Sequence, residues 1–251
     1  MPVQFSACTF GYRRRQRVIE RLDFDVPAGR TVLLGPNGAG KSTLLGLAAS
    51  ALAPRDGDVV YAGMSTADRG AVGDYRRRVA WMPQQLAWVR GLTVRDQVAY
   101  VGWLKGMSRS DAWERALEAL RQVELADRAD ERIGRLSGGQ QRRVGVAQSL
   151  VHGAELLLLD EPTAGMDPRQ RRVFHDVLGN LGRSVHVVLS THDTADLDTT
   201  YDNVVVLVSG KVVYSGEVRD FLAHAAAGTA PGRTADAAYH ALTETGTAWA
   251  F

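Results

Sequence analysis

The chain has 251 residues, of which 45% are hydrophobic and 23% are charged, and its formal net charge is +2. This size predicts one domain, or one domain with an additional lobe, and the small net charge excludes a strong attraction to polyanions or membrane surfaces. The single cysteine, Cys8, excludes an internal disulfide and fits a reducing cytosol. The N-terminus lacks the apolar core of a signal peptide, and no window approaches 18 consecutive apolar residues, so we expect no membrane-spanning segment.

Short strands are expected at the start of the chain. Val3–Thr9 alternates apolar and polar residues, Asp23–Val26 forms a second short run, and the Pro-Ala-Gly sequence after it predicts a turn. Two aromatic residues, Tyr12 and Phe10, lie between these runs. Either ring is a candidate to stack on a nucleotide base, and packing into the core is the alternative for both.

A glycine-rich stretch, Gly35–Thr43 (GPNGAGKST), follows the apolar run Thr31–Leu34 and precedes the apolar helical stretch Leu44–Ala49. Strand, glycine-rich turn and helix start are the context in which G-x-x-x-x-G-K-[ST] forms a phosphate-binding loop. Backbone N–H groups and the helix N-terminus would surround phosphate oxygens, Lys41 would reach the β- and γ-phosphates, and the Ser42 hydroxyl would coordinate Mg²⁺. The candidate nucleotide-binding residues of this loop are Gly35, Pro36, Asn37, Gly38, Ala39, Gly40, Lys41, Ser42 and Thr43.

The middle of the chain begins with strands and then becomes helical. Asp56–Tyr61 and Val79–Met82 read as strands, and Gln84 follows the second, where its amide could contact Mg²⁺ or the attacking water. Within Leu92–Arg128 apolar residues recur at helical spacing, which predicts a compact helical insert. The sequence LSGGQQ then opens a helix that is expected to end near Val151.

Two later strands end in polar residues. Leu156–Asp160 is an apolar strand that ends in a carboxylate, and Glu161 follows it. Ligands of open parallel sheets bind at the carboxyl ends of the strands, so Asp160 is placed to hold Mg²⁺ and Glu161 to deprotonate a water. His192 follows the strand Val185–Leu189 and is a candidate to contact the γ-phosphate.

The rest of the chain completes a βα pattern. A helix is expected at Pro168–Leu181 and a hairpin from the strands Val204–Val208 and Lys211–Tyr214. The segment after residue 225 is rich in Ala, Gly and Thr, and we expect a short helix at Ala235–Leu242 within it.

Over about residues 3–224 the chain resembles the nucleotide-binding subunit of ATP-binding-cassette (ABC) transporters. Gly35–Ser42 is similar to the Walker A motif, Gln84 to the Q-loop, and Leu136–Gln140 (LSGGQ) to the signature motif. The remaining motifs that resemble this family are Walker B with the catalytic Glu at Leu156–Glu161, the D-loop at Ala164–Asp167, and the switch His at His192. The D-loop has Met166 where Leu is usual.

The resemblance implies a head-to-tail dimer of two cassettes with ATP between them. Helix-starting N–H groups and a Ser hydroxyl suit an anion, so the signature motif of one subunit would bind the nucleotide held by Lys41 of the other. The residues that this implies for the partner's nucleotide are Ser137, Gly138, Gly139, Gln140 and Asp167. The implied catalytic residues are Glu161, Gln84 and His192, and the implied ligands of Mg²⁺ are Ser42, Gln84 and Asp160.

We therefore expect an α/β fold: a P-loop NTPase core with a mixed sheet and flanking helices, plus a small helical lobe that carries LSGGQ. The ATPase domain would span 1–225, with the core at about 1–89 and 152–225, the helical lobe at about 90–151, and a short C-terminal tail at 226–251. The expected function is ATP hydrolysis at the cytoplasmic face of the membrane, which would power transport through a separate transmembrane subunit. By analogy with the exporters of this family, the expected direction is export. The alternatives are a soluble ABC ATPase and a non-catalytic subunit of a heterodimer.

The expected partners are a second nucleotide-binding subunit and a membrane subunit, with no nucleic acid. Because Pro83 and Gly91 flank or interrupt it, we expect Gln84–Leu92 not to form one regular element, and loops of this kind lie on surfaces. This segment contains Trp88, which is either an exposed interface anchor or a core residue. In the family that the chain resembles, this region receives a coupling helix of the membrane subunit.

Overall fold

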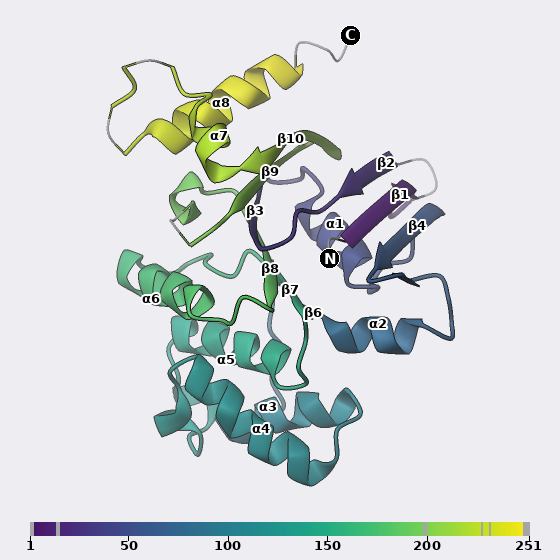
Figure 1. Cartoon of the computed structure of the whole chain (residues 1–251). Coiled ribbons are helices and arrows are strands. Elements are labelled where there is room, and N and C mark those ends of the chain that lie inside the picture. The colour runs from purple at the N-terminus through teal and green to yellow at the C-terminus, as the bar shows by residue number, and fades with distance from the viewer. Residues whose placement is uncertain (1–2, 14–15, 198–199, 227, 231, 248–251) are drawn as a thin grey trace. The chain divides into compact units, whose positions relative to one another are not determined.

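The structure is a computed structural model that describes residues 3–13, 16–197, 200–226, 228–230 and 232–247. The chain forms two compact units, one from residues 1–75 and 188–251 and the other from residues 76–187. Figure 1 shows the elements of both in chain order. Each unit is described by itself.

The first unit contains a four-stranded antiparallel sheet with the order β2-β1-β4-β5. Its strands are β1 (Val3–Phe10), β2 (Ile19–Asp25), β4 (Asp56–Tyr61) and β5 (Met64–Ser65). The expected strands at 3–9 and 56–61 are confirmed, whereas the second begins at Ile19 and not at Asp23, because Ile19 and Leu22 also face the core. Cys8 is buried in β1, and burial raises the pKa of its thiol to about 11, so it is a packing residue.

Four further strands of this unit lie in the order β10-β9-β3-β8 within a second sheet. β3 (Arg30–Leu34) pairs in parallel with β9 (Asn203–Val208), and β9 pairs with β10 (Lys211–Glu217) in an antiparallel hairpin. β8 (His186–Thr191) contributes its last four residues to this unit. Residues 31–34 and 204–207 are buried without a break, as expected for strands covered on both faces. Helix α1 (Lys41–Ala48) follows β3.

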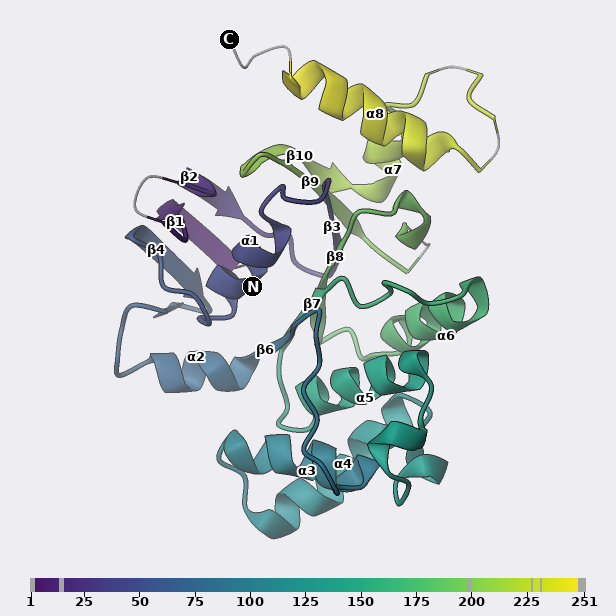
Figure 2. The ribbon, with the colours of Figure 1, turned by 180° about the vertical axis from the view of Figure 1, so that it is seen from behind.

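Two helices near the end of the described chain pack onto this second sheet. Helix α7 (Val218–Leu222) follows β10, and α8 (Thr234–Thr247) lies beside α7, as Figures 1 and 2 show. It also packs against β9, β10 and the short 3₁₀ helix η3 (Thr194–Asp196). The helix is longer than the expected 235–242. Its Asp236 accepts a hydrogen bond from Thr194, which ties it to the segment that follows β8.

The second unit contains a parallel strand pair and four longer helices. β6 (Val79–Met82) pairs in register with β7 (Leu156–Asp160). The helices are α3 (Val94–Leu104), α4 (Arg109–Gln122), α5 (Gly138–Leu150) and α6 (Pro168–Gly179), with 3₁₀ turns η1 (Ala126–Arg128) and η2 (Ile133–Arg135) between α4 and α5. α3, α4 and α5 pack on one another, and α6 packs on α5, as both views of the ribbon show.

Capping residues set the starts of these helices. Thr93 and Asp96 form a capping box at α3, Ser108 caps α4, and Asp167 caps α6 with Pro168 in its first turn. The expected helical insert is thus two capped helices. Helix α2 (Val72–Arg78), where the chain passes from the first unit to the second, was not predicted, because Tyr75 is its one buried residue and it has no apolar period.

Candidate functional site

The glycine-rich loop of residues 35–43, called the phosphate loop below, connects β3 to α1 in the first unit. Gly40 is the N-cap of α1 with φ 103°, a conformation that favours glycine, and no side chain caps this helix N-terminus. Gly35 has no room for a side chain, because a Cβ there would lie 2.3 Å from the carbonyl oxygen of Leu207. These glycines let the backbone turn tightly before α1. The N–H groups of the first turn of a helix point out of its N-terminus, where an anion can bind.

Lys41 is buried at the start of α1. Its ammonium group donates hydrogen bonds to the carbonyl oxygens of Gly35 at 2.7 Å and Pro36 at 3.2 Å. The ammonium therefore lies within the curve of the phosphate loop. Next to it, the Ser42 side chain is exposed at the first turn of the helix. A cation and a hydroxyl beside uncapped N–H groups suit a phosphate and a divalent cation.

Tyr12 and Phe10, the two candidates for stacking on a base, lie in different environments. Tyr12 is 65% exposed, and its hydroxyl is 3.2 Å from the hydroxyl of Thr43 in the phosphate loop. Phe10 is buried and meets the Tyr12 ring edge to face, with ring centroids 5.1 Å apart. Phe10 thus packs against the Tyr12 ring and is itself covered, whereas most of Tyr12 is exposed.

His192 directly follows β8 and its side chain is exposed. The turn around it is fixed by hydrogen bonds: Thr191 Oγ1 donates to the buried Asp196 at 2.5 Å, and the Asp193 N–H donates to Thr191 Oγ1 at 3.0 Å. His192 therefore lies in a hydrogen-bonded turn at the end of a strand.

In the second unit, Asp160 ends β7 as a buried carboxylate, and Glu161 follows it half-buried. Gln84, which lies 77 residues earlier, donates a hydrogen bond from Nε2 to Glu161 Oε2 at 3.3 Å. Glu161 has φ 45°, a left-handed backbone conformation that is uncommon for a residue with a β-carbon. Two of the predicted catalytic side chains are thus in contact, one of them on a strained backbone.

The predicted signature motif forms the start of α5. Ser137 is the N-cap, and it makes a capping box with Gln140: the Gln140 N–H donates to Ser137 Oγ, and the Ser137 N–H donates to Gln140 Oε1. The Gln140 side chain is therefore used to stabilise the helix start. Gly138 is exposed and Gly139 is buried against Gln170 of α6.

A cavity of about 750 Å³, called the signature cavity below, brings several of these groups together within the second unit. Gln84, Gly138 and Gly139 line it together with Asp167, whose carboxylate accepts from the Gln170 N–H at 2.8 Å. The other lining residues are Gln85, Leu86, Trp88, Gln141, Arg142, Ala164, Gly165, Met166 and Gln170. Sequence reasoning missed Arg142, because it reads as an ordinary exposed residue of a helix.

Within the second unit, two oxygen groups are of the kind that a magnesium ion prefers. Asp160 supplies a carboxylate, and the Gln84 amide supplies an oxygen when its nitrogen is bonded to Glu161. Mg²⁺ is usually held by one or two carboxylates together with substrate phosphates. Among the residues that the structure describes, no group of three or more His, Cys, Asp or Glu residues could hold a metal without such help.

Comparison with known proteins gives consistent relatives. Residues 19–164 match the family described as "ABC transporter". The chain is 33% identical to a phosphonates import ATP-binding protein, PhnC 1, of Rhodopseudomonas palustris (strain BisB18), over 85% of this chain and 84% of that protein. It is 36% identical to the daunorubicin/doxorubicin resistance ATP-binding protein DrrA of Streptomyces peucetius, over 80% of this chain and 61% of that protein.

A solved structure also matches along most of the chain. It is the dimeric structure of the ATP-binding cassette MJ0796 in a post-hydrolysis state, bound to ADP and Pi, with a TM-score of 0.75 and 26% identity. The match covers 86% of this chain and 99% of that one, and it confirms the expected α/β fold of a P-loop NTPase. Within the described residues, no helix combines the length and the apolar character needed to cross a membrane.

Proposed function

This chain belongs to the ABC transporter family as an ATP-binding subunit, and on that premise we propose that it hydrolyses ATP to power export through a separate transmembrane subunit. The observation that carries the proposal is the phosphate loop, with a buried Lys41 beside an uncapped helix start. The direct test is phosphate release by the purified chain with Mg–ATP, which we expect to stop when EDTA removes the metal. No release under these conditions would exclude the ATPase.

Each predicted site residue has a role in this proposal. The backbone of residues 35–43 and Lys41 bind the phosphates of ATP, and Ser42, Asp160 and Gln84 hold Mg²⁺. Bound there, the metal would neutralise charge on the β- and γ-phosphates. Glu161 takes a proton from the attacking water, Gln84 orients Glu161, and His192 contacts the γ-phosphate.

A second copy of a cassette would complete the site. The N–H groups at the α5 start, with Ser137 and Gly138 exposed, suit the γ-phosphate of a nucleotide bound to the partner. The exposed Asp167 would lie at the same interface. The dimeric cassette that matches this chain supports this assembly. Losing the γ-phosphate would remove the ligand that the two subunits share and open the dimer.

We expect Tyr12→Ala to weaken ATP binding about tenfold, because stacking on a base is worth about 1–3 kcal/mol by alanine substitution. Calorimetric titration with ATP measures the change. Tyr12→Phe is the matched control: it keeps the ring and removes the hydroxyl that faces Thr43. Equal ATP affinity for Tyr12→Ala and the wild-type chain would exclude Tyr12 from adenine binding.

The membrane partner would contact the segment Gln84–Leu92. This segment has no regular secondary structure over residues 83–92, and the buried Gln97 holds it by a pair of hydrogen bonds with the backbone of Val89. Val89 is 43% exposed, and Trp88 is half-buried beside the signature cavity. A segment that is fixed by hydrogen bonds and has exposed apolar side chains is suited to bind another protein.

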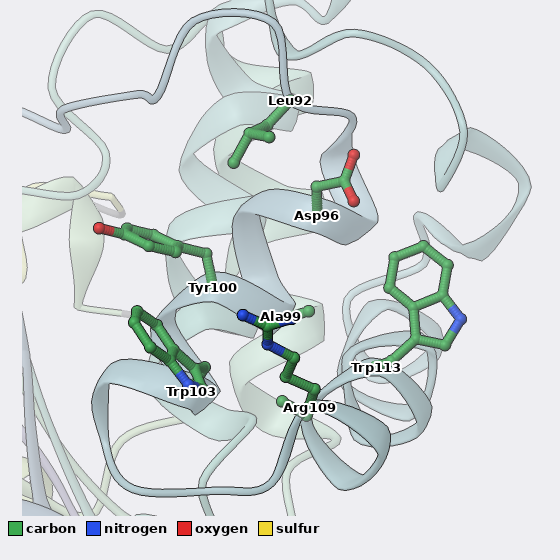
Figure 3. Close-up of a pocket in the computed structure, with 8 residues that line it drawn as sticks. Leu92, Asp96, Ala99, Tyr100, Trp103, Arg109 and Trp113 are labelled. Carbon is green, nitrogen blue, oxygen red and sulfur yellow. The ribbon is translucent and has the colours of Figure 1, made fainter.

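An aromatic pocket of about 390 Å³ adjoins the same segment through Leu92. Figure 3 shows Tyr100 and Trp103 side by side along one rim, with ring centroids 6.0 Å apart, and Trp113 on the opposite side. All three aromatic residues are at least 40% exposed. Such a surface favours an apolar helix or loop of the membrane subunit as its ligand.

We expect Trp88→Ala to reduce co-purification with the proposed membrane subunit, while the ATPase activity of the isolated subunit is kept. Trp103→Ala, at a more exposed position, should have the same effect without a loss of thermal stability. A collapse of the unfolding temperature in Trp88→Ala would show that Trp88 is a core residue. Normal co-purification of both stable variants would place the membrane contact elsewhere.

A further inference from the structure

Arg142 of α5 binds the backbone of residues Gln84–Leu92, called the Gln84 segment below. Its Nη1 donates a hydrogen bond to the carbonyl oxygen of Gln84. The side chain is half-buried. Desolvating a cation costs free energy that an exposed arginine avoids, and the carbonyl oxygen partly offsets this cost. The contact is therefore a specific one, built at an energetic cost.

A second contact fixes the same segment to the same face of α5. Gly145 lies one helical turn after Arg142, and residues three apart share a helix face. A Cβ at Gly145 would lie 3.0 Å from Leu86 Cδ1 and 3.0 Å from Met82 Sδ. Leu86 thus packs directly on the helix backbone. The Gln84 segment is held on α5 by a hydrogen bond at Gln84 and by close packing at Leu86.

The Gln84 side chain leaves this attachment toward Glu161, and the two are in contact at 3.3 Å. Helix α5 begins at the signature motif, where Ser137 and Gln140 cap it. One rigid helix thus carries the signature motif at its N-terminus and the Arg142 attachment one turn later. Gln84, Gly138 and Arg142 line the same cavity.

We propose that Arg142 is a positioning residue for ATP hydrolysis: it fixes the Gln84 backbone to the signature helix, so that the Gln84 amide stays directed at Glu161. This inference rests on the proposed ATPase function. Arg142 touches neither Glu161 nor a reacting atom in this arrangement, and it acts through Gln84. Movement of the signature helix would carry the backbone of Gln84 with it.

The neighbouring Arg143 provides a matched control on the same helix. It donates to the carbonyl oxygen of Val123 at 2.8 Å and lies 3.7 Å from the Glu124 carboxylate. These partners follow α4 and lie outside the predicted site. Arg143→Ala removes a cation of the same size and is expected to affect stability alone.

The test compares ATP hydrolysis by Arg142→Ala, Arg142→Lys and Arg143→Ala with the wild-type chain, each checked for thermal unfolding. We expect Arg142→Ala to lower kcat about tenfold with an unchanged KM for ATP, because small misplacements of a positioned group cost up to about a hundredfold. Arg142→Lys keeps a donor and should recover part of the rate. Arg143→Ala should keep kcat.

A double-mutant cycle with Gln84→Ala separates positioning from general destabilisation. If Arg142 acts through the Gln84 side chain, Arg142→Ala should change kcat less than about twofold in the Gln84→Ala background. Hydrogen exchange of the Gln84–Leu92 amides should become faster in Arg142→Ala and not in Arg143→Ala. This measurement does not depend on ATPase activity, so it tests the attachment even when hydrolysis is slow. Three results would overturn the inference: equal hydrogen exchange of these amides in Arg142→Ala and Arg143→Ala, a normal kcat for Arg142→Ala, or the same loss of kcat on Arg142→Ala with and without Gln84→Ala. A wild-type chain without ATPase activity would overturn the proposed function and this inference with it.

Discussion

Glu161→Gln is expected to bind ATP normally and to lose about 10²–10⁴-fold in steady-state hydrolysis, because the water loses its base while the phosphate loop is unchanged. The amide has nearly the shape of the carboxylate, and its oxygen can still accept the hydrogen bond that Gln84 donates. The loss therefore reports proton transfer and not a rearranged site. ATP should trap this variant as a dimer, which size-exclusion chromatography detects.

Glu155→Gln is the matched control for this experiment. Glu155 precedes β7, at the end of the strand opposite Asp160, and forms an exposed ion pair with Arg78 at 3.4 Å. The same change from carboxylate to amide there should leave hydrolysis within about twofold of wild type, because exposed ion pairs contribute little. Near-normal turnover by Glu161→Gln would remove Glu161 from the role of base.

Lys41→Ala is expected to weaken ATP binding by about 10–100-fold, because a hydrogen bond to a charged group contributes about 1.5–3 kcal/mol. The loss should be larger for ATP than for AMP, which lacks the β- and γ-phosphates. Calorimetric titration with both nucleotides measures the difference. The structure shows Lys41 bonded to Gly35 and Pro36, so thermal unfolding of the variant must be measured as well.

Lys211→Ala controls for the loss of a lysine. Lys211 begins β10 in the same unit and is exposed; the N–H of the preceding Gly210 donates to the carbonyl oxygen of Ala39 in the phosphate loop at 2.8 Å, a backbone contact that the substitution keeps. Its removal should change neither ATP affinity nor stability appreciably. Unchanged ATP affinity in a folded Lys41→Ala variant would contradict the assignment of the phosphate loop.

The parts of the fold that the sequence predicts are those in which one local pattern decides the structure. Residues 156–159 are four leucines, and a short apolar run of this length that ends in Asp-Glu-Pro is typical of a buried strand. The phosphate loop is predictable because its glycines, Lys41 and Ser42 follow a strand and begin a helix. The start of α5 has the same quality, since Ser137 and Gln140 have the spacing of a capping box.

The contacts between distant segments could not be predicted in this way. Gln84 and Glu161 were each placed at the end of a strand, yet their hydrogen bond depends on how two strands align. Arg142 shows the same limit, because nothing in a helical run tells which turn faces a neighbouring loop. The left-handed conformation of Glu161 is a third case, since tertiary packing overrides its local preference.

That conformation has a consequence for laboratory evolution of this protein. A left-handed backbone costs a residue with a β-carbon about 1–2 kcal/mol, a cost that glycine avoids and asparagine reduces. A library selected for heat resistance alone would therefore be enriched in glycine or asparagine at position 161. The enriched variants would be more stable but would lack ATPase activity. Selection for robustness must be paired with selection for turnover, because at Glu161 the two objectives oppose each other.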